Sequence, residues 1–344
     1  MAFPVTPLDI KTELRIDGAW VDVTADVYTR DLMTIARGQP DEGSRSDPGK
    51  LNLTLNNGAS KAAPGVSGRY SEGNPLSDLY GKIGRNTPVR IHLPKSTAHL
   101  ELDGDATGYV STPHAAALNI VGDIDVRIEF DSDMTDTARN QTLFGKWSTS
   151  NTERAWCVRY YLGNLAFGWR DAAAVSWEAS ISAGLYGGGA LRVTLDVDDG
   201  AGGLAVKFYQ ADSISGPWSQ IGNTVTGGFT TAIQSTTTSD LRVGPTDATV
   251  TPNRVPFIGT ATRAQVRSGI DGTLVADLDV RALADGATGV TDSTGRVWTV
   301  NGTAKIRKRA DRFVGEISAW PPRWDVSGKD RWVPVEDSGL LGRP

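Results

Sequence analysis

Apolar and polar side chains alternate along much of this chain with a period of two. In LNLTLNN the leucines at positions 51, 53 and 55 fall on one face of an extended segment, and polar residues fall on the other. VRIHL repeats the pattern from Val89 to Leu93. In ELRIDGAWVDV, Asp17 and Gly18 stand where a hairpin turn is expected. Helical periodicity is scarce, and NPLSDLYGKIG suggests at most a short helical turn, so the pattern predicts an all-β protein.

The composition changes at Lys95 and stays changed until Lys305, becoming richer in Gly, Ala, Thr, Asp and aromatic residues. Turn dipeptides such as Gly163-Asn164, Asp199-Gly200 and Asp271-Gly272 separate several short apolar runs there. Many short strands at this spacing predict a two-sheet sandwich or jelly roll. The strand candidates are 123–130, 142–147, 155–162, 165–170, 191–197, 204–210, 241–244, 263–269 and 297–302.

A length of 344 residues is enough for two cores of ordinary size. The net charge of −5 lacks the clustered basic residues that nucleic acid or an anionic membrane attracts, so neither is expected as a partner. The one basic run, from Arg307 to Arg309, is expected to be a solvated linker at a domain junction. Cys157, the single cysteine, stands in the apolar run AWCVRYYL and is expected to be a buried, inert thiol.

The N-terminal sequence MAFPVTPLDIK lacks the charged start and apolar stretch of a secretory signal, and no apolar run approaches a membrane span. We therefore expect synthesis and folding in a bacterial cytoplasm.

Two blocks far apart in the sequence resemble the framework of minor tail proteins from actinobacterial phages and prophages. The first contains ELRIDGAWVDVTADVYTRD, IARGQPDEGSRSDPGKLNLTLNN and NPLSDLYGKIGRNTPVRI, and the second is RFVGEISAWPPRWDVSGKDRWVPV. In that family the second block normally follows directly on the first. The resemblance implies one discontinuous framework domain, 1–94 plus 312–344, interrupted by a domain at 95–311. It also implies a place in the virion tail among other tail proteins, in several identical copies. Relatives continue for many residues beyond SGLLGRP, so we expect a fragment or a shortened version.

The inserted region resembles laminin-G-like domains of the concanavalin A superfamily over most of residues 96–306. The resemblance is carried by HLELDGDATGYVSTPHAAALNIVGDIDVRIEF, TLFGKWSTSNTERAWCVRYY, LRVTLDVDDGAGGLAVKFYQADSISGPWSQIG and RAQVRSGIDGTLVADLDVRAL. It implies a jelly-roll sandwich that is presented outward and holds host-surface glycan. Two alternatives stay open: a polysaccharide-degrading enzyme on the same fold, and a decorative domain that binds nothing.

An acidic trio, Asp123, Asp125 and Glu129, tests the enzyme alternative. Hydrolases of this superfamily open their motif with Glu, where this chain has Asp. On a regular strand Asp125 and Glu129 are roughly 13 Å apart, whereas glycoside hydrolysis needs carboxyls about 5 to 9.5 Å apart. With Arg127 on the same face, we expect a solvated charged stripe and no enzymatic activity. His92, His99 and His114 likewise show no metal-ligand spacing.

Two acidic loops contain candidate oxygen ligands. Asp131, Asp133 and Asp136 in DSDMTD would suit Ca²⁺, but an EF-hand would need Gly at the sixth place and Glu at the twelfth. A plain acidic loop without a cofactor is the simpler expectation, and calcium is the alternative. For the Asp196, Asp198 and Asp199 group, solvation or turn capping is simpler than a metal.

Aromatic residues next to polar donors are the usual elements of a sugar site. Trp147 ends one strand before the polar loop STSNTER, and Trp169 ends another before Arg170 and Asp171. These four residues are the candidate glycan-binding set, although a packed role is the alternative for each tryptophan, as expected for Trp156. The other aromatics available in this domain are Trp177, Tyr186 and Trp218.

The segment SAWPPRWDVSGKDRWVPV combines Trp320, Trp324 and Trp332 with two prolines that cannot join a central ladder. We expect an edge segment that closes the core of the framework domain. The alternative is a contact surface for a neighbouring tail subunit, because Trp and Arg are enriched in interface anchors.

Overall fold

The computed structural model describes residues 9–28, 31–38, 47–132, 140–161, 163–182, 188–246, 256–327 and 330–339. These residues form antiparallel strands and no α-helix, which confirms the all-β prediction. The only helical turns among them are η1 (Thr24–Asp26), η2 (Ala116–Leu118) and η3 (Asn151–Glu153). No helix in this part of the chain could cross a membrane.

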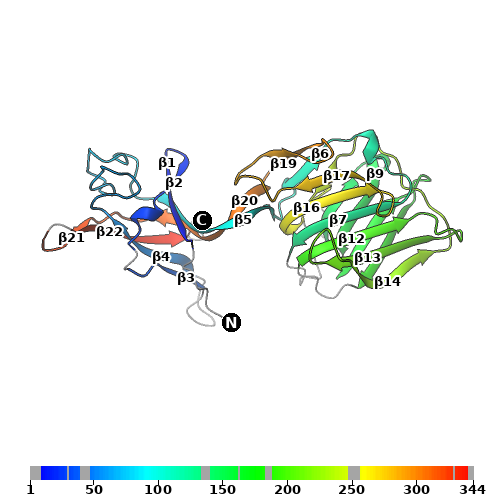
Figure 1. Ribbon diagram of the computed structural model, residues 1–344, viewed down its shortest axis with the longest axis horizontal. Helices are drawn as coiled ribbons and strands as arrows, with labels where there is room; N and C mark the ends of the chain where they lie inside the picture. The colour runs from blue at the N-terminus through cyan, green and yellow to red at the C-terminus, as the bar shows by residue number, and fades with distance from the viewer. Residues whose placement is uncertain are drawn as a thin grey trace. The chain divides into compact units, whose positions relative to one another are not determined.

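The chain divides into two compact units, seen in Figure 1. Unit 1 combines Met1–Lys95 with Arg309–Pro344, and unit 2 is Ser96–Lys308. The boundaries fall close to the predicted ones. Two long strands, β5 (Thr87–Asp103) and β20 (Lys305–Ile317), each continue from one unit into the other.

The basic run from Arg307 to Arg309 lies inside β20, so the expectation of a solvated linker is wrong. Arg309 is 8% exposed, and the Nε of Arg307 lies 3.4 Å from Oε2 of Glu101. The strand continues through the basic residues without a break at the junction.

Unit 1 is built from strands of both flanks of the insertion. Its core joins Leu14, Leu53 and Ile91 from the first flank to Phe313 and Val333 from the second. The ladder between β4 and β22 pairs the flanks directly, with Leu55 opposite Val333. Asp17 (φ 50°) and Gly18 (φ 82°) form the predicted hairpin turn between β1 and β2. The strands besides β5 and β20 are β1 (Lys11–Ile16), β2 (Ala19–Asp22), β3 (Thr34–Gly38), β4 (Asp47–Asn56), β21 (Arg323–Trp324) and β22 (Arg331–Gly339).

Unit 2 is a β-sandwich of two antiparallel sheets, here named the β7 sheet and the β9 sheet (Figure 1). In the β7 sheet the order is β14-β13-β12-β7-β16, with β17 also pairing with β16. The order in the other is β11-β10-β9-β8-β15-β6-β19-β18. The β7 sheet contains β7 (Ile124–Asp131), β12 (Gly188–Asp196), β13 (Leu204–Ala211), β14 (Ser219–Gly227), β16 (Ile258–Ser268) and β17 (Thr273–Asp279). The β9 sheet contains β6 (Tyr109–Thr112), β8 (Asn140–Trp147), β9 (Arg154–Tyr161), β10 (Asn164–Arg170), β11 (Ser176–Ser182), β15 (Leu241–Val243), β18 (Gly289–Thr291) and β19 (Val297–Asn301).

The sandwich core lies between these two sheets. Val126 and Ile128 of β7 face it from one side, and Phe144, Trp156 and Phe167 face it from the other. Phe144 meets Trp156 edge to face, with ring centroids 5.4 Å apart. Trp156 is 1% exposed and Cys157 is 3% exposed, so the expectations of a packed tryptophan and a buried thiol are confirmed.

Candidate functional site

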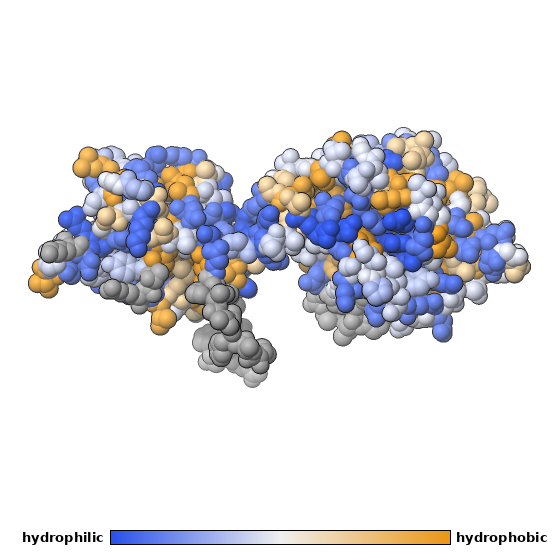
Figure 2. Space-filling model, in the orientation of Figure 1, coloured by the Kyte–Doolittle hydropathy of each residue, from blue (hydrophilic) through white to orange (hydrophobic). Residues whose placement is uncertain are grey.

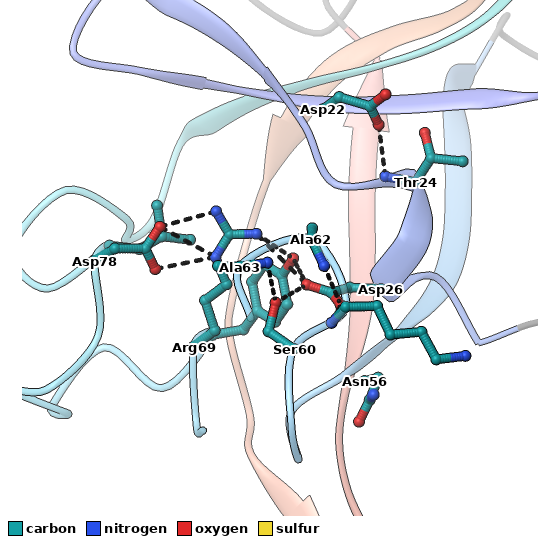
Figure 3. Close-up of polar contacts among 12 residues, drawn as sticks. Asp22, Thr24, Asp26, Asn56, Ser60, Ala62, Ala63, Arg69 and Asp78 are labelled. Carbon is teal, nitrogen blue, oxygen red and sulfur yellow. Dashed lines mark hydrogen bonds and ion pairs between the residues drawn. The ribbon is translucent and has the colours of Figure 1, made fainter. Parts of the chain in front are cut away.

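The polar network of unit 1 centres on the buried carboxylate of Asp26 (Figure 3). Asp26 accepts hydrogen bonds from Ser60 Oγ (2.6 Å), the backbone N–H of Lys61 (2.6 Å) and the hydroxyl of Tyr70 (2.8 Å). Burial alone would raise the pKa of Asp26, but the hydrogen bonds from Ser60 and Tyr70 outweigh it and lower the pKa. Figure 3 shows the guanidinium of Arg69 between Asp26 and Asp78. These hydrogen bonds thus attach the coil after β4 to η1, and the polar groups of the network bond to one another.

The tryptophans of the C-terminal segment lie in three different environments. Trp320 is 5% exposed, and its Nε1 donates to the carbonyl oxygen of Gly84 at 3.0 Å, so it closes the unit 1 core as expected. A subunit-contact role for Trp320 is therefore wrong, because its ring has no free face. Trp332 is half-buried on β22. Trp324, on the short strand β21, is 66% exposed and is the one of the three available to a neighbour.

In unit 2, the predicted glycan-binding residues come together at one end of the β9 sheet. Antiparallel pairing places four strand termini at the same end of the sheet: the end of β8, the start of β9, the end of β10 and the start of β11. Trp147 is half-buried there, with the guanidinium carbon of Arg154 5.5 Å from its ring centroid. Arg170 and Asp171 follow at the end of β10, and both are half-buried.

Trp169 does not line the rim, so this part of the prediction is wrong. Its side chain points into the sandwich, is 3% exposed and stacks on Phe167 with ring centroids 6.1 Å apart. Its Nε1 donates to Thr231 Oγ1 at 3.2 Å. Both faces and the polar edge of the indole are engaged in packing.

A different aromatic pair, Trp177 and Phe229, lies beside Asp171, whereas Arg170 pairs with Ser176 on the other face of the sheet. Their ring centroids are 4.5 Å apart, and Trp177 Nε1 donates to Asp171 Oδ2 at 2.7 Å. Trp177 is half-buried, and Phe229 is 38% exposed. We call Asp171, Val175, Trp177 and Phe229 the aromatic rim. From the sequence, Trp177 was only one of several available aromatics, because its strand, SWEASIS, has few apolar residues.

The segment that carries Phe229 is fixed to the β10–β11 turn. The backbone N–H of Ala172 donates to Ala232 at 3.1 Å, and Arg170 Nε donates to Gln234 Oε1 at 3.1 Å. Arg170 Nη1 also donates to Ser176 Oγ at 3.1 Å. These bonds fix the backbone that carries Phe229, and the carboxylate of Asp171 is held beside the Trp177 ring, as a binding surface requires.

Beneath this end of the sandwich, the side chain of Lys146 is fully buried. Its Nζ contacts Thr236 Oγ1 and lies 3.3 Å from His114 Nδ1. Burial lowers the pKa of Lys146 to about 8, although the charges of Glu153 and Asp240 oppose the shift. Burial would raise the pKa of Glu153, but backbone N–H groups from Thr238 and its neighbours lower it to about 2. Both groups anchor the segment 231–239.

The expected calcium ligands are largely outside the described residues. Asp131 ends β7 and is exposed, whereas Asp133 and Asp136 fall in the segment that is not described. Within the described ranges no group of His, Cys, Asp or Glu side chains could hold a metal. Asp199 Oδ1 accepts from the N–H of Ala201 (2.8 Å) and of Gly203 (3.0 Å), which confirms turn capping there.

The acidic trio of β7 is not a solvated stripe, so that expectation is wrong. Asp125 is 0% exposed and Arg127 is 7% exposed. Arg127 donates to Asp125 through Nε (3.0 Å) and Nη2 (2.7 Å), and Arg192 does the same from β12 at 3.1 and 2.8 Å. The charges are buried because the chain after β13 crosses this face, where the N–H of Ile214 donates to Glu129 Oε1 at 2.6 Å. Figure 2 shows the resulting hydrophilic band over β16, β7 and β12.

A second carboxylate lies close to Asp125. Asp271 Oδ1 lies 2.5 Å from Arg127 Nη2, the same nitrogen that Asp125 contacts, and the Asp271 N–H donates to Asp125 Oδ2 at 3.0 Å. The two carboxyls are thus about as near as those of a retaining glycosidase, which lie about 5 Å apart. Asp125, however, accepts five hydrogen bonds from these two arginines and Asp271, and it has no access to solvent. It has neither a spare lone pair nor room for a glycosidic oxygen.

No protein-family model and no curated protein sequence matches this chain. Among solved structures, the chain is similar to a candidate carbohydrate-binding protein from Bacteroides ovatus, with 13% identity, 64% of this chain and 68% of that chain covered, and a TM-score of 0.40. It is also similar to the CBM40 domain of the Ruminococcus gnavus IT-sialidase, with 15% identity, 49% and 88% covered, and a TM-score of 0.32. For the botulinum neurotoxin serotype G binding domain the identity is 10%, the coverage is 87% and 47%, and the TM-score is 0.25. Likenesses this distant say nothing about what unit 2 binds.

Proposed function

We propose that this chain is a structural component of a phage or phage-like tail, and that its unit 2 binds host-surface glycan reversibly at the aromatic rim. The observation that carries the binding role is the partly exposed Trp177–Phe229 pair beside the carboxylate of Asp171. A pyranose offers C–H patches to an aromatic face and hydroxyls to charged neighbours. The rim supplies both kinds of partner on a fixed backbone.

The tail role rests on the two framework blocks and is supported by the way they fold. Residues of both blocks fill the same core in unit 1, and the β4–β22 ladder joins them. A framework domain that folds around an inserted domain can attach to a particle while the inserted domain is displayed. Trp324 is the residue of unit 1 that we assign to contact with a neighbouring tail subunit. Many copies on one particle would make weak individual glycan sites effective.

We infer binding rather than hydrolysis because Asp125, which lies close to Asp271, is locked under two arginines. Incubation of the purified chain with envelope polysaccharide is expected to release no reducing ends. Release that disappears in Asp125→Asn would contradict this inference.

Retention of the purified full chain on actinobacterial envelope fractions tests the binding role. The wild type is expected to be retained, and Trp177→Ala is expected to lose about ten-fold or more in affinity, because truncating an aromatic anchor at a binding surface commonly costs about 2 kcal/mol or more. Tyr80→Ala is the matched control, since Tyr80 is 53% exposed but lies in unit 1. Failure of the wild type to bind any fraction would favour a decorative domain. Unchanged retention of Trp177→Ala would show that the glycan site does not lie at the aromatic rim.

Electron microscopy of particles with this chain labelled tests the tail role. Label at the tail is the expected result, and label incorporation should fall for Trp324→Ala. Particles without label, from cells that produce the chain, would contradict the assignment.

A further inference from the structure

The most unusual polar structure in unit 2 is a pair of arginines fixed side by side on the outer face of the β7 sheet. Arg127 and Arg192 are direct partners in the β7–β12 register, and each side chain is 8% exposed. Buried Asp125 holds both guanidiniums through bidentate pairs, so neither side chain is free to change rotamer. Two parallel N–H donors on a planar fork are the geometry that recognises carboxylates in proteins.

A carboxylate already occupies the outer side of this pair, and it belongs to Asp271. Its two oxygens lie 2.5 Å from Arg127 Nη2 and 2.8 Å from Arg192 Nη2, so one carboxylate bridges both arginines. Unlike Asp125, the Asp271 side chain is 65% exposed. Burial alone would raise the pKa of Asp271, but hydrogen bonds and charge from Arg192 and Arg127 lower it. Asp271 therefore marks the place where an external carboxylate would bind.

Two aromatic rings lie over the arginine pair, and a cavity lies farther along β12 and β13. The ring centroid of Trp218 lies 5.6 Å from the guanidinium carbon of Arg127 and 6.0 Å from that of Arg192. Tyr209, opposite Arg192 in the β12–β13 register, lies 5.2 Å from it. The cavity has a volume of about 380 Å³, within the range of small-molecule sites. It is lined by Gly188, Gln210, Ala211, Asp212, Pro217 and Ser219. The cavity lies at the start of β12 and the end of β13.

We propose that the Arg127–Arg192 pair is a binding site for the carboxylate of an acidic sugar, such as a uronic acid residue, and that Asp271 fills it when no ligand is bound. With Asp271 turned toward solvent, the two arginines and Asp125 carry one net positive charge, which matches a monocarboxylate. Displacing Asp271 breaks its ion pairs with both arginines, and because its side chain is mostly exposed, water takes their place. Asp125 stays in place and keeps the donors oriented. The site is separate from the aromatic rim and does not depend on glycan binding there.

Calorimetric titration of the full chain with sodium galacturonate, galactose and acetate tests this assignment. The Asp271→Asn variant is expected to bind galacturonate about ten-fold more tightly than the wild type, because the internal competitor loses its charge. Galactose is expected to bind neither protein. Asp279→Asn is the matched control: it removes one charge from β17, in the same sheet, where Asp279 pairs with Arg281 rather than with the arginine pair. An equal gain in the control would show a general charge effect and overturn the proposal.

The double variant with Asp271→Asn and Arg192→Lys keeps the positive charge but lacks the two parallel guanidinium donors of Arg192. The affinity for galacturonate that Asp271→Asn gained should therefore be lost. Acetate binding as tight as galacturonate binding would reveal a simple anion site and overturn the sugar assignment. If Asp271→Asn does not fold, the indole N–H resonance of Trp218 in the wild type provides the answer. Saturating galacturonate should shift it and galactose should not, and an unmoved resonance would contradict the proposal.

Discussion

Trp320 stacks on Tyr70 with ring planes 3° apart and centroids 6.1 Å apart. The two residues come from opposite sides of the inserted domain, since Tyr70 precedes Ser96 and Trp320 follows Lys308. A packing contact in the middle of the unit 1 core therefore requires both flanks of the chain. The core of unit 1 is thus built from apolar residues of both flanks.

Replacing Trp320 by Ala is expected to lower the free energy of unfolding of unit 1 by about 3 to 5 kcal/mol, the usual cost of truncating a buried tryptophan. The change also leaves the Gly84 carbonyl without its indole donor. Thermal unfolding followed by calorimetry should show the transition of unit 1 moving down while that of unit 2 stays in place. Trp324→Ala, at an exposed position, is the control and should move neither transition. Equal effects of the two substitutions would be inconsistent with the stacked arrangement.

Asp26→Asn is expected to destabilise unit 1 by about 2 to 4 kcal/mol at pH 7, because buried hydrogen-bonded charges are costly to disrupt. The pKa of Asp26 is lowered in the folded state, so its carboxylate contributes stability above its ordinary value of 3.8. That contribution is lost as the pH falls through the folded-state pKa. The difference between wild type and Asp26→Asn should therefore shrink as unfolding is measured from pH 6 down to pH 3. A difference that is constant with pH would mean that the charge does not matter.

Lys146→Met is expected to stabilise unit 2 by about 2 kcal/mol at pH 7. Burying the charged amine carries a penalty of about 1.4 kcal/mol for each unit by which its pKa is lowered, and losing the contacts with Thr236 and His114 offsets part of the gain. Burial lowers the pKa of Lys146 from 10.5 to about 8, so the full penalty applies below pH 8. It disappears as the pH rises toward 10.5, where the unfolded chain also loses the proton. Chemical denaturation of both proteins at pH 7 and pH 10 measures the effect. A gain at pH 10 as large as that at pH 7 would contradict the buried-amine interpretation.

Local alternation predicted many of the strands that bury one face, although β6, β11 and β17 also do so and were not predicted. Leu51, Leu53 and Leu55 are all buried, and each run of the inserted region predicted as a strand lies in or overlaps one. The strand β14 was missed because its residues are mostly exposed at a sheet edge, so SQIGNTVTG carries no apolar alternation.

The burial of charged groups could not be predicted in the same way. Asp125 meets Arg192 only because β7 pairs with β12, and nothing near Asp125 in the sequence indicates that partner. The chain after β13 then covers the face, as the hydrogen bond from Ile214 to Glu129 shows. Trp169 and Trp177 are direct cross-strand partners on β10 and β11, yet one is buried in the core and the other lies half-exposed beside Phe229. Which tryptophan contributes to the rim depends on the segment 228–234, whose course the strand pattern does not predict.

The indole resonances of the full chain, recorded by proton–nitrogen correlation NMR during titration with a purified envelope glycan that retains the protein, test the binding role most directly. The Trp177 indole N–H, which donates to Asp171, should shift and saturate with the glycan concentration, while the buried Trp298 and Trp320 signals stay fixed. Saturable shifts confined to other tryptophans, with Trp177 unmoved, would contradict a glycan site at the aromatic rim.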